Sequence, residues 1–111
     1  MSEPVIDLPT FTALQEAAGA EFVVELVDTF LEEAPAMLAE LRSAQAAGKA
    51  DAFRRAAHSI KSNSHTFGAT RLGEMARDIE LGGLPADGAG IDALEAEYQR
   101  VAAKLTELTC G

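Results

Sequence analysis

The chain has 111 residues, of which 18 are acidic and 9 are basic, so its net charge is −9. This length is typical of a single domain with one core, and the acidic balance argues against a nucleic-acid partner, since binding to a phosphate backbone is driven by a basic surface. No apolar run approaches the roughly 20 residues that span a bilayer, and the N-terminal sequence lacks the pattern of a signal peptide. We therefore expect a cytoplasmic protein that makes no membrane contact.

The composition favours helices and offers no thiolate metal cluster. Hydrophobic residues make up 48% of the chain, are mostly Ala and Leu, and include few β-branched side chains. The single cysteine, Cys110, lies next to the C-terminus, where no internal disulfide is possible. We interpret it as part of a frayed tail and predict no metal site.

The first predicted element is a short amphipathic helix over about 10–18. The preceding residues are expected to be extended because Pro4 and Pro9 resist a helix, and Thr10 is a candidate cap. Such a helix is too short to be stable alone, so it must lie across a larger element. Its apolar positions are Phe11, Leu14 and Ala18, and Gly19 ends it.

A long helix is predicted over about 20–47, where apolar residues recur every three or four positions. Pro35 removes one amide donor and crowds the carbonyl of Leu31, which predicts a bend rather than a break, and Gly48 ends the helix. The apolar positions are Val23, Leu26, Val27, Phe30, Ala34, Met37, Leu38 and Leu41.

The next predicted helix, over about 51–67, has one apolar and one polar face. Asp51 is a candidate cap and Gly68 a candidate turn residue. The small Ser64 falls on the inward face, where its hydroxyl is expected to bond to the carbonyl of Ile60. The predicted buried set is Phe53, Ala56, Ala57, Ile60, Ser64 and Phe67, and the predicted exposed set is Arg54, Arg55, His58, Lys61, Ser62 and His65.

Two further amphipathic helices are predicted over about 70–81 and 91–108, separated by a glycine-rich, flexible-looking stretch from Gly82 to Gly90. Helices with one apolar stripe each and short connections bury those stripes together as an up-down antiparallel four-helix bundle. We therefore predict an all-α single domain over residues 1–111, with the short N-terminal helix covering one end. The inward positions are Leu72, Met75, Ala76 and Ile79 in one helix and Ile91, Leu94, Tyr98, Val101, Leu105 and Leu108 in the other.

His58 lies near the centre of the polar face of the helix over 51–67, surrounded by cations. Its neighbours one turn away are Arg54, Arg55, Lys61 and Ser62. Residues 52–73 contain four basic and no acidic side chains, although the chain as a whole is acidic. This pattern predicts an anion site, while cations that are simply common on a solvated helix face remain an alternative.

The residue types fit phosphoryl chemistry. A neutral imidazole, whose ordinary pKa is about 6.5, is a nucleophile that can attack phosphorus when it is exposed. Lys61 offers charge stabilisation one turn away, and the small Ser62 lets the active site of another protein approach.

These residues resemble the histidine-containing phosphotransfer domains of multistep two-component phosphorelays. The resemblance rests on AHSIKSNS at residues 57–64 and covers essentially the whole chain. The further matching positions are Asp7, Phe11, Leu14, Gly19, Phe30, Glu33, Ala34, Pro35, Phe67, Gly68, Ala69, Leu72, Met75, Ala76, Ile79 and Glu80.

The resemblance implies a role for each residue of the motif. His58 corresponds to the phosphorylated histidine, with the phosphoryl group on Nε2, and Lys61 to the lysine that steadies this group. Ser62 takes a place often held by glycine, and it slightly narrows the approach to His58. Together with Arg54, Arg55 and Ser62, His65 is a candidate partner contact.

His65 is a second histidine on the face of His58, and the family usually has a small or polar residue there. The seven-residue separation places the two rings about 10 Å apart along the helix axis, so one metal ion cannot bridge them. We interpret His65 as a polar residue at the edge of the docking surface, with an auxiliary phosphoacceptor or a partner-specific contact as the alternative.

The resemblance further implies a phosphocarrier that accepts a phosphoryl group from the aspartyl phosphate of one receiver domain and passes it to another, in a pathway that includes a hybrid histidine kinase. No nucleotide-binding glycine motif is present, so we expect no ATP site and no cofactor, with magnesium held only by the receiver. We expect a monomer. The phosphoacceptor bundle of a histidine kinase, a helical interaction module that is never phosphorylated, and a cofactor-binding bundle are the alternatives.

Overall fold

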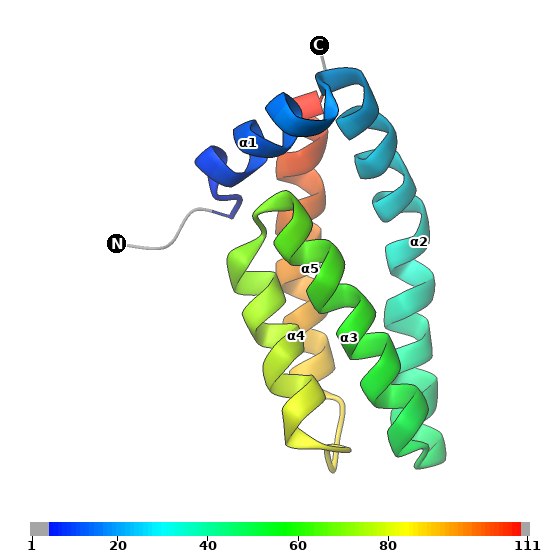
Figure 1. Ribbon diagram of the computed structural model, residues 1–111. Coiled ribbons are helices and arrows are strands. Elements are labelled where there is room, and N and C mark those ends of the chain that lie inside the picture. Colours follow the sequence, from blue (N-terminus) through cyan, green and yellow to red (C-terminus); the bar gives the residue numbers. More distant parts are fainter. Residues whose placement is uncertain (1–4, 110–111) are drawn as a thin grey trace.

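The computed structural model describes residues 5–109, which form five helices and no strand. In chain order they are α1 (Leu8–Ala18), α2 (Ala20–Ala47), α3 (Ala50–Phe67), α4 (Thr70–Gly82) and α5 (Ala89–Thr109), as Figure 1 shows. The predicted all-α class is confirmed. None of the helices within the described residues combines the length and apolar character that a membrane span requires.

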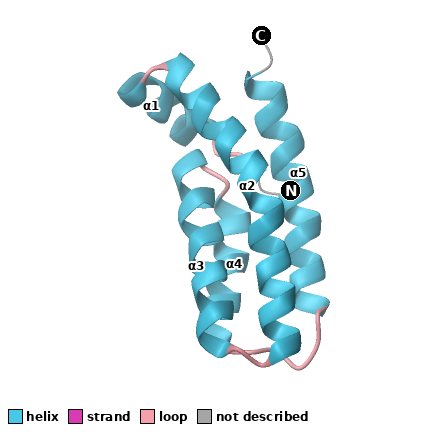
Figure 2. Cartoon of the chain, turned by 90° about the vertical axis from the view of Figure 1, so that its right-hand side faces the viewer, coloured by secondary structure: helices cyan, strands magenta, loops and turns pink. Residues whose placement is uncertain are grey.

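The four long helices form a closed ring. Helix α3 packs between α2 and α4, and α5 packs between α4 and α2, so each helix has two neighbours. Helix α1 lies across one end of this bundle, against α2 and α3 (Figure 2). This arrangement is the predicted up-down bundle with a short N-terminal helix over one end, and one chain supplies all of its helices.

The predicted faces of α3 match the structure. The buried residues of this helix are the six predicted ones, Phe53, Ala56, Ala57, Ile60, Ser64 and Phe67. Ser64 is fully buried, and its hydroxyl donates a hydrogen bond of 2.6 Å to the carbonyl of Ile60, as expected. Of the six residues predicted to be exposed, five are exposed and Lys61 is partly exposed.

An aromatic cluster joins three of the helices at the core. The ring of Phe30 on α2 lies 5.5 Å from the ring of Phe67 on α3 and 5.8 Å from the ring of Tyr98 on α5. The pair with Tyr98 is edge to face, an arrangement favoured by the charge distribution of aromatic rings. Helix α2 continues through Pro35 without interruption, so it supplies Phe30 as part of one long element.

Two of the predicted helix caps are wrong. Helix α1 begins at Leu8, and its cap is Asp7, whose carboxylate accepts a hydrogen bond of 3.2 Å from the amide of Thr10. Pro9 fits inside the first turn because the amide it lacks has no partner in a helix at that position. Helix α3 begins at Ala50 without a side-chain cap.

Smaller differences concern helix ends and the edges of the apolar stripes. Helix α4 ends at Gly82, and α5 extends from Ala89 to Thr109, one to two residues beyond the predicted bounds. Ala18 is exposed because α1 contacts the bundle chiefly through Phe11. Pro4 and Cys110 lie outside the described residues.

Glu97 is the main departure from the predicted pattern of α5. The side chain is 2% exposed, although Glu97 is not among the inward positions predicted for this helix. Arg100 pairs with its Oε1 at 2.8 Å, and Arg71 of α4 lies 3.6 Å from the same atom. The two arginines compensate the buried charge, which explains how a carboxylate occupies the boundary between α4 and α5.

Candidate functional site

His58 stands on the solvent face of α3, as predicted. Its side chain is 56% exposed, whereas Ala57 and Ile60 on the opposite side of the helix are buried in the core. The packed face fixes the helix, and the helix in turn holds the imidazole at the surface about midway between its two ends. A histidine in this place is accessible to another protein.

The structure places Glu80 of α4 against both predicted phosphoryl-transfer residues. Its Oε2 lies 3.0 Å from Nδ1 of His58, and its Oε1 lies 3.1 Å from Nζ of Lys61. The carboxyl side chain is only 15% exposed, because it occupies the seam between α3 and α4. One carboxylate therefore joins the imidazole and the ammonium group into a single cluster.

This contact fixes the protonation of the ring. An ionised carboxylate can only accept hydrogen bonds, so Nδ1 of His58 must carry the proton that it donates to Glu80. In the neutral imidazole the lone pair is then on Nε2, the atom that faces away from Glu80. The tautomer that this contact favours therefore leaves the lone pair of the neutral ring on Nε2.

The ionised state of Glu80 is favoured by its two partners. The hydrogen bond from Lys61 is the largest influence, and together with the hydrogen bond from His58 it lowers the pKa of Glu80 below its ordinary value, against the opposing effect of burial. Glu80 is therefore an acceptor at neutral pH.

The cations around His58 are more neutralised than the sequence predicts. Arg54 pairs with Asp51 at 2.8 Å, and Lys61 pairs with Glu80. Arg71 lies against the buried Glu97 on another side of the bundle. Within residues 5–109, Arg55 is the cation of the predicted segment that has no carboxylate at ion-pair distance.

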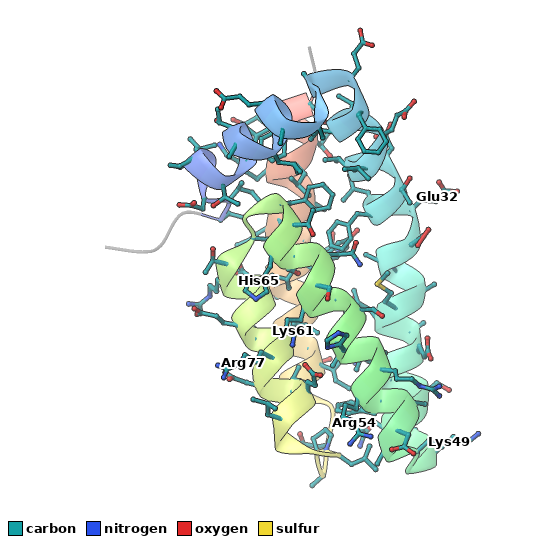
Figure 3. All side chains as sticks on the ribbon, in the orientation of Figure 1. Glu32, Lys49, Arg54, Lys61, His65 and Arg77 are labelled. Carbon is teal, nitrogen blue, oxygen red and sulfur yellow. The ribbon has the colours of Figure 1, made fainter. Side chains whose placement is uncertain are left out.

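Ser62 and His65 complete the exposed face of α3. Both residues are exposed, and Figure 3 shows His65 on the same helix as Lys61. The ring of His65 lies over Gly73 of α4, so close that a Cβ at Gly73 would be 2.8 Å from Nε2 of the ring. His65 is thus a contact between α3 and α4 as well as a surface residue.

Glu80 was not among the predicted site residues, although it belongs to the motif on which the resemblance rests. Helix periodicity places Glu80 at the edge of the apolar stripe, beside Ile79, but it does not show which helix lies opposite. The pairing of α3 with α4 was needed to bring Glu80 to His58. Among the described residues, no group of three or more potential ligands is arranged to hold a metal ion.

Comparison with known proteins finds a matching family and a similar solved structure. The sequence profile of the Hpt domain matches residues 25–104. The crystal structure of histidine-containing phosphotransfer protein B from Pseudomonas aeruginosa PAO1 is similar, with a TM-score of 0.88 and 30% sequence identity. The match covers 97% of this chain and 96% of that one. No curated protein sequence matches the chain.

Proposed function

This chain belongs to the Hpt domain family of phosphorelay proteins, and we propose that it carries a phosphoryl group on Nε2 of His58 between receiver domains. The observation that supports this assignment is the contact between Nδ1 of His58 and Glu80, which leaves the lone pair of an exposed imidazole on Nε2.

The transfer is a displacement at phosphorus. The lone pair of Nε2 attacks the phosphorus of an aspartyl phosphate on the donor, while the bond from phosphorus to the aspartate oxygen breaks and its electron pair stays on the carboxylate. The proton on Nδ1 remains there, held by Glu80, so the phosphorylated ring carries positive charge that the carboxylate stabilises. Transfer to a second aspartate reverses these steps.

Lys61 is placed to balance the charge of the carried group. Its ammonium lies 3.1 Å from Glu80 and its side chain is 25% exposed, so it can turn from the carboxylate toward a phosphoryl group on His58. Glu80 then keeps the ring oriented while Lys61 stabilises the added negative charge. Exposed Arg54, Arg55, Ser62 and His65 surround this cluster as contacts for the partner.

The proposal makes the protein a phosphocarrier without its own ATP site. The phosphoryl group enters from a receiver domain that is fed by a hybrid histidine kinase, and the magnesium that assists transfer is held by the receiver. Because one chain completes the ring of helices, we propose that the protein acts as a monomer. We further propose that it acts in the cytoplasm. A kinase phosphoacceptor module would build its bundle from two chains.

Labelling by a phosphorylated receiver tests the assignment. A panel of receiver domains from the same genome is loaded with acetyl phosphate and mixed with the protein, and transferred phosphate is tested for acid lability and alkali stability. We expect labelling of the wild type and no labelling of His58→Gln. His65→Gln is the matched control for a second histidine on the same helix face, and it should still be labelled because His65 is a partner contact and not the acceptor.

Two results would contradict the proposal. Labelling of His58→Gln at the wild-type level would place the phosphoryl group elsewhere, and loss of labelling only in His65→Gln would make His65 the acceptor. Binding of a receiver with no phosphate exchange in any variant would favour the interaction module, since that role needs the exposed face but no nucleophile.

A further inference from the structure

Arg77 of α4 is an exposed cation beside the phosphotransfer cluster that the sequence pattern did not single out. It lies outside the basic segment of residues 52–73 and on a different helix from His58. Helix α4 also carries Glu74 and Asp78 near it, yet within residues 5–109 no carboxylate lies at ion-pair distance from Arg77. Its charge is therefore available to a partner.

The pairing of α3 with α4 places Arg77 opposite Lys61. Two contacts define this pairing, that of His65 with Gly73 and that of His58 with Glu80. Because the two helices are antiparallel, the step from His65 back to His58 on α3 corresponds to the step from Gly73 forward to Glu80 on α4, seven residues in each case. Lys61 lies four residues from His65 and three from His58.

Arg77 has the same spacing on α4, four residues from Gly73 and three from Glu80, and so it lies at the same level along the bundle as Lys61. Figure 3 shows Lys61, His65 and Arg77 near one another on these two helices, with the side chain of Arg77 at the outer edge of α4. At the level of the site on α4, Arg77 thus adds a cation without an ion pair in the described part of the chain, between the exposed Glu74 and Asp78.

The other side of α3 has the opposite charge. Helix α2 presents Glu32, Glu33 and Glu40 along an exposed groove, and Figure 3 shows Glu32 on the side of the molecule away from Arg77. A partner that carries carboxylates around its phosphoryl site is attracted toward Arg77 and repelled from the carboxylates of α2. His58 lies between these two regions.

We propose that Arg77 is a docking residue that pairs with a carboxylate on the receiver and sets the side from which the receiver approaches His58. This inference rests on the proposed function, and it extends the docking surface from α3 to α4. Arg77 acts on the encounter of the two proteins and not on the chemistry at Nε2. Its effect is therefore expected in the rate of transfer between proteins and not in the reactivity of the imidazole.

The test compares Arg77→Glu with Lys49→Glu. Lys49 is an exposed cation just before α3 and has no ion pair among the described residues. It lies about 14 Å along the helix from His58. Lys49→Glu therefore makes the same charge change far from the site. Transfer is measured from the phosphorylated receiver that labels the wild type fastest. At low salt we expect Arg77→Glu to slow transfer about tenfold and Lys49→Glu to change it less than about twofold.

Three further measurements separate docking from chemistry and from folding. The difference between Arg77→Glu and the wild type should shrink severalfold at about 0.5 M salt, because exposed charges are then screened. Arg77→Lys should restore most of the rate. Labelling by phosphoramidate, a small phosphodonor that needs no protein docking, should be the same for Arg77→Glu and the wild type.

The outcomes also distinguish this inference from the proposed function. If phosphoramidate and receivers label His58 but Arg77→Glu and Lys49→Glu behave alike, Arg77 is not a docking residue although His58 is the carrier. Loss of phosphoramidate labelling in Arg77→Glu would show that Arg77 acts on the site itself and would overturn the docking role. If no receiver labels the wild type, the proposed function fails and the inference fails with it.

Discussion

At the scale of single residues, the site is a histidine whose two ring nitrogens have different surroundings. Nδ1 lies 3.0 Å from Glu80 in the seam between α3 and α4, and the side chain as a whole is 56% exposed. Lys61 shares the same carboxylate, so the ammonium is kept next to the ring in the unphosphorylated protein. Under the proposed function, the orientation of the ring and the nearby ammonium charge are set before a receiver docks, which would lower the free-energy cost of forming the reactive arrangement.

The lowered pKa of Glu80 predicts how stability depends on pH. Glu80 is ionised in the folded protein at pH values where it would begin to bind a proton when unfolded, so its ion pair with Lys61 stabilises the fold above the ordinary pKa of 4.5. This stabilisation is lost as the pH falls through the lowered pKa. At neutral pH we expect Glu80→Gln to reduce the free energy of unfolding by less than about 1 kcal/mol.

Urea unfolding of both proteins between neutral and acidic pH measures this dependence. The difference between wild type and Glu80→Gln should disappear under acidic conditions. Glu74→Gln removes an exposed carboxylate of the same helix and should show no comparable pH-dependent difference. A Glu80→Gln difference that stayed constant down to acidic pH would mean that the ion pair contributes nothing to stability.

The sequence predicted some residues of the site and not others, for a physical reason. Helical periodicity is a property of one segment, and it correctly placed His58 in solvent and Ser64 in the core. The surroundings of Lys61 depend on which helix packs beside α3, and that information lies in tertiary contacts. The positive surface therefore looked stronger in the sequence than it is, because the pairing of Lys61 with Glu80 could not be foreseen from spacing.

At the scale of the element, α3 holds its polar side chains at the surface because its buried and its polar positions lie on different faces of the helix. Six buried positions anchor it to the core, and the polar positions between them remain exposed or partly exposed. Ser64 is the one buried position of the helix with a polar side chain, and its hydroxyl is satisfied by the carbonyl of Ile60 within the same helix. No polar group of Ser64 is left unpaired, so the small side chain serves close packing.

Ser64→Leu tests this division of α3. The larger side chain enters a fully buried position, so we expect overpacking to reduce the free energy of unfolding by about 1 to 3 kcal/mol. Ser62→Leu, two residues earlier and exposed, should change it by less than about 0.5 kcal/mol. Urea denaturation of both variants measures the contrast, and equal effects would show that the helix is not rotated as the structure describes.

Helix ends were predicted less well than helix faces. Every predicted helix exists, because the apolar stripes extend over many turns and the glycines that end them are few. Caps depend on single side chains, and several residues near each start were chemically able to serve. Asp7 caps α1, where Thr10 was expected, and Asp51 pairs with Arg54 inside the first turn of α3, where it was expected to cap.

At the scale of the whole molecule, α1 is joined to the bundle at the turn between α3 and α4. The amide of Asp7 donates a hydrogen bond of 2.8 Å to the carbonyl of Gly68, the residue that ends α3 with a φ of 82°. Phe11 adds a buried side chain to the core. The sequence predicted that α1 covers one end of the bundle but not which end. The contact between Asp7 and Gly68 determines the end, and it joins residues far apart in the chain.

Gly68 and Gly48 offer a matched pair for measuring what this junction contributes. Both residues end a helix with positive φ, so replacing either one by alanine should lower the free energy of unfolding by about 1 kcal/mol through backbone strain alone. At Gly48 a Cβ meets nothing within 4 Å, whereas at Gly68 it would be 2.9 Å from the carbonyl oxygen of Asp7 and 3.0 Å from Cβ of Thr10. We therefore expect Gly68→Ala to lower the free energy of unfolding by about 1 to 3 kcal/mol more than Gly48→Ala does.

The extra loss should be confined to the junction with α1. Hydrogen exchange of the α1 amides should accelerate in Gly68→Ala and stay unchanged in Gly48→Ala, because only the first substitution pushes the start of α1 from the bundle. Urea unfolding of the two variants gives the difference in free energy. Equal losses, together with unchanged exchange in α1, would mean that the close approach at Gly68 does not hold α1 in place, and Phe11 would then be the main attachment of α1 to the core.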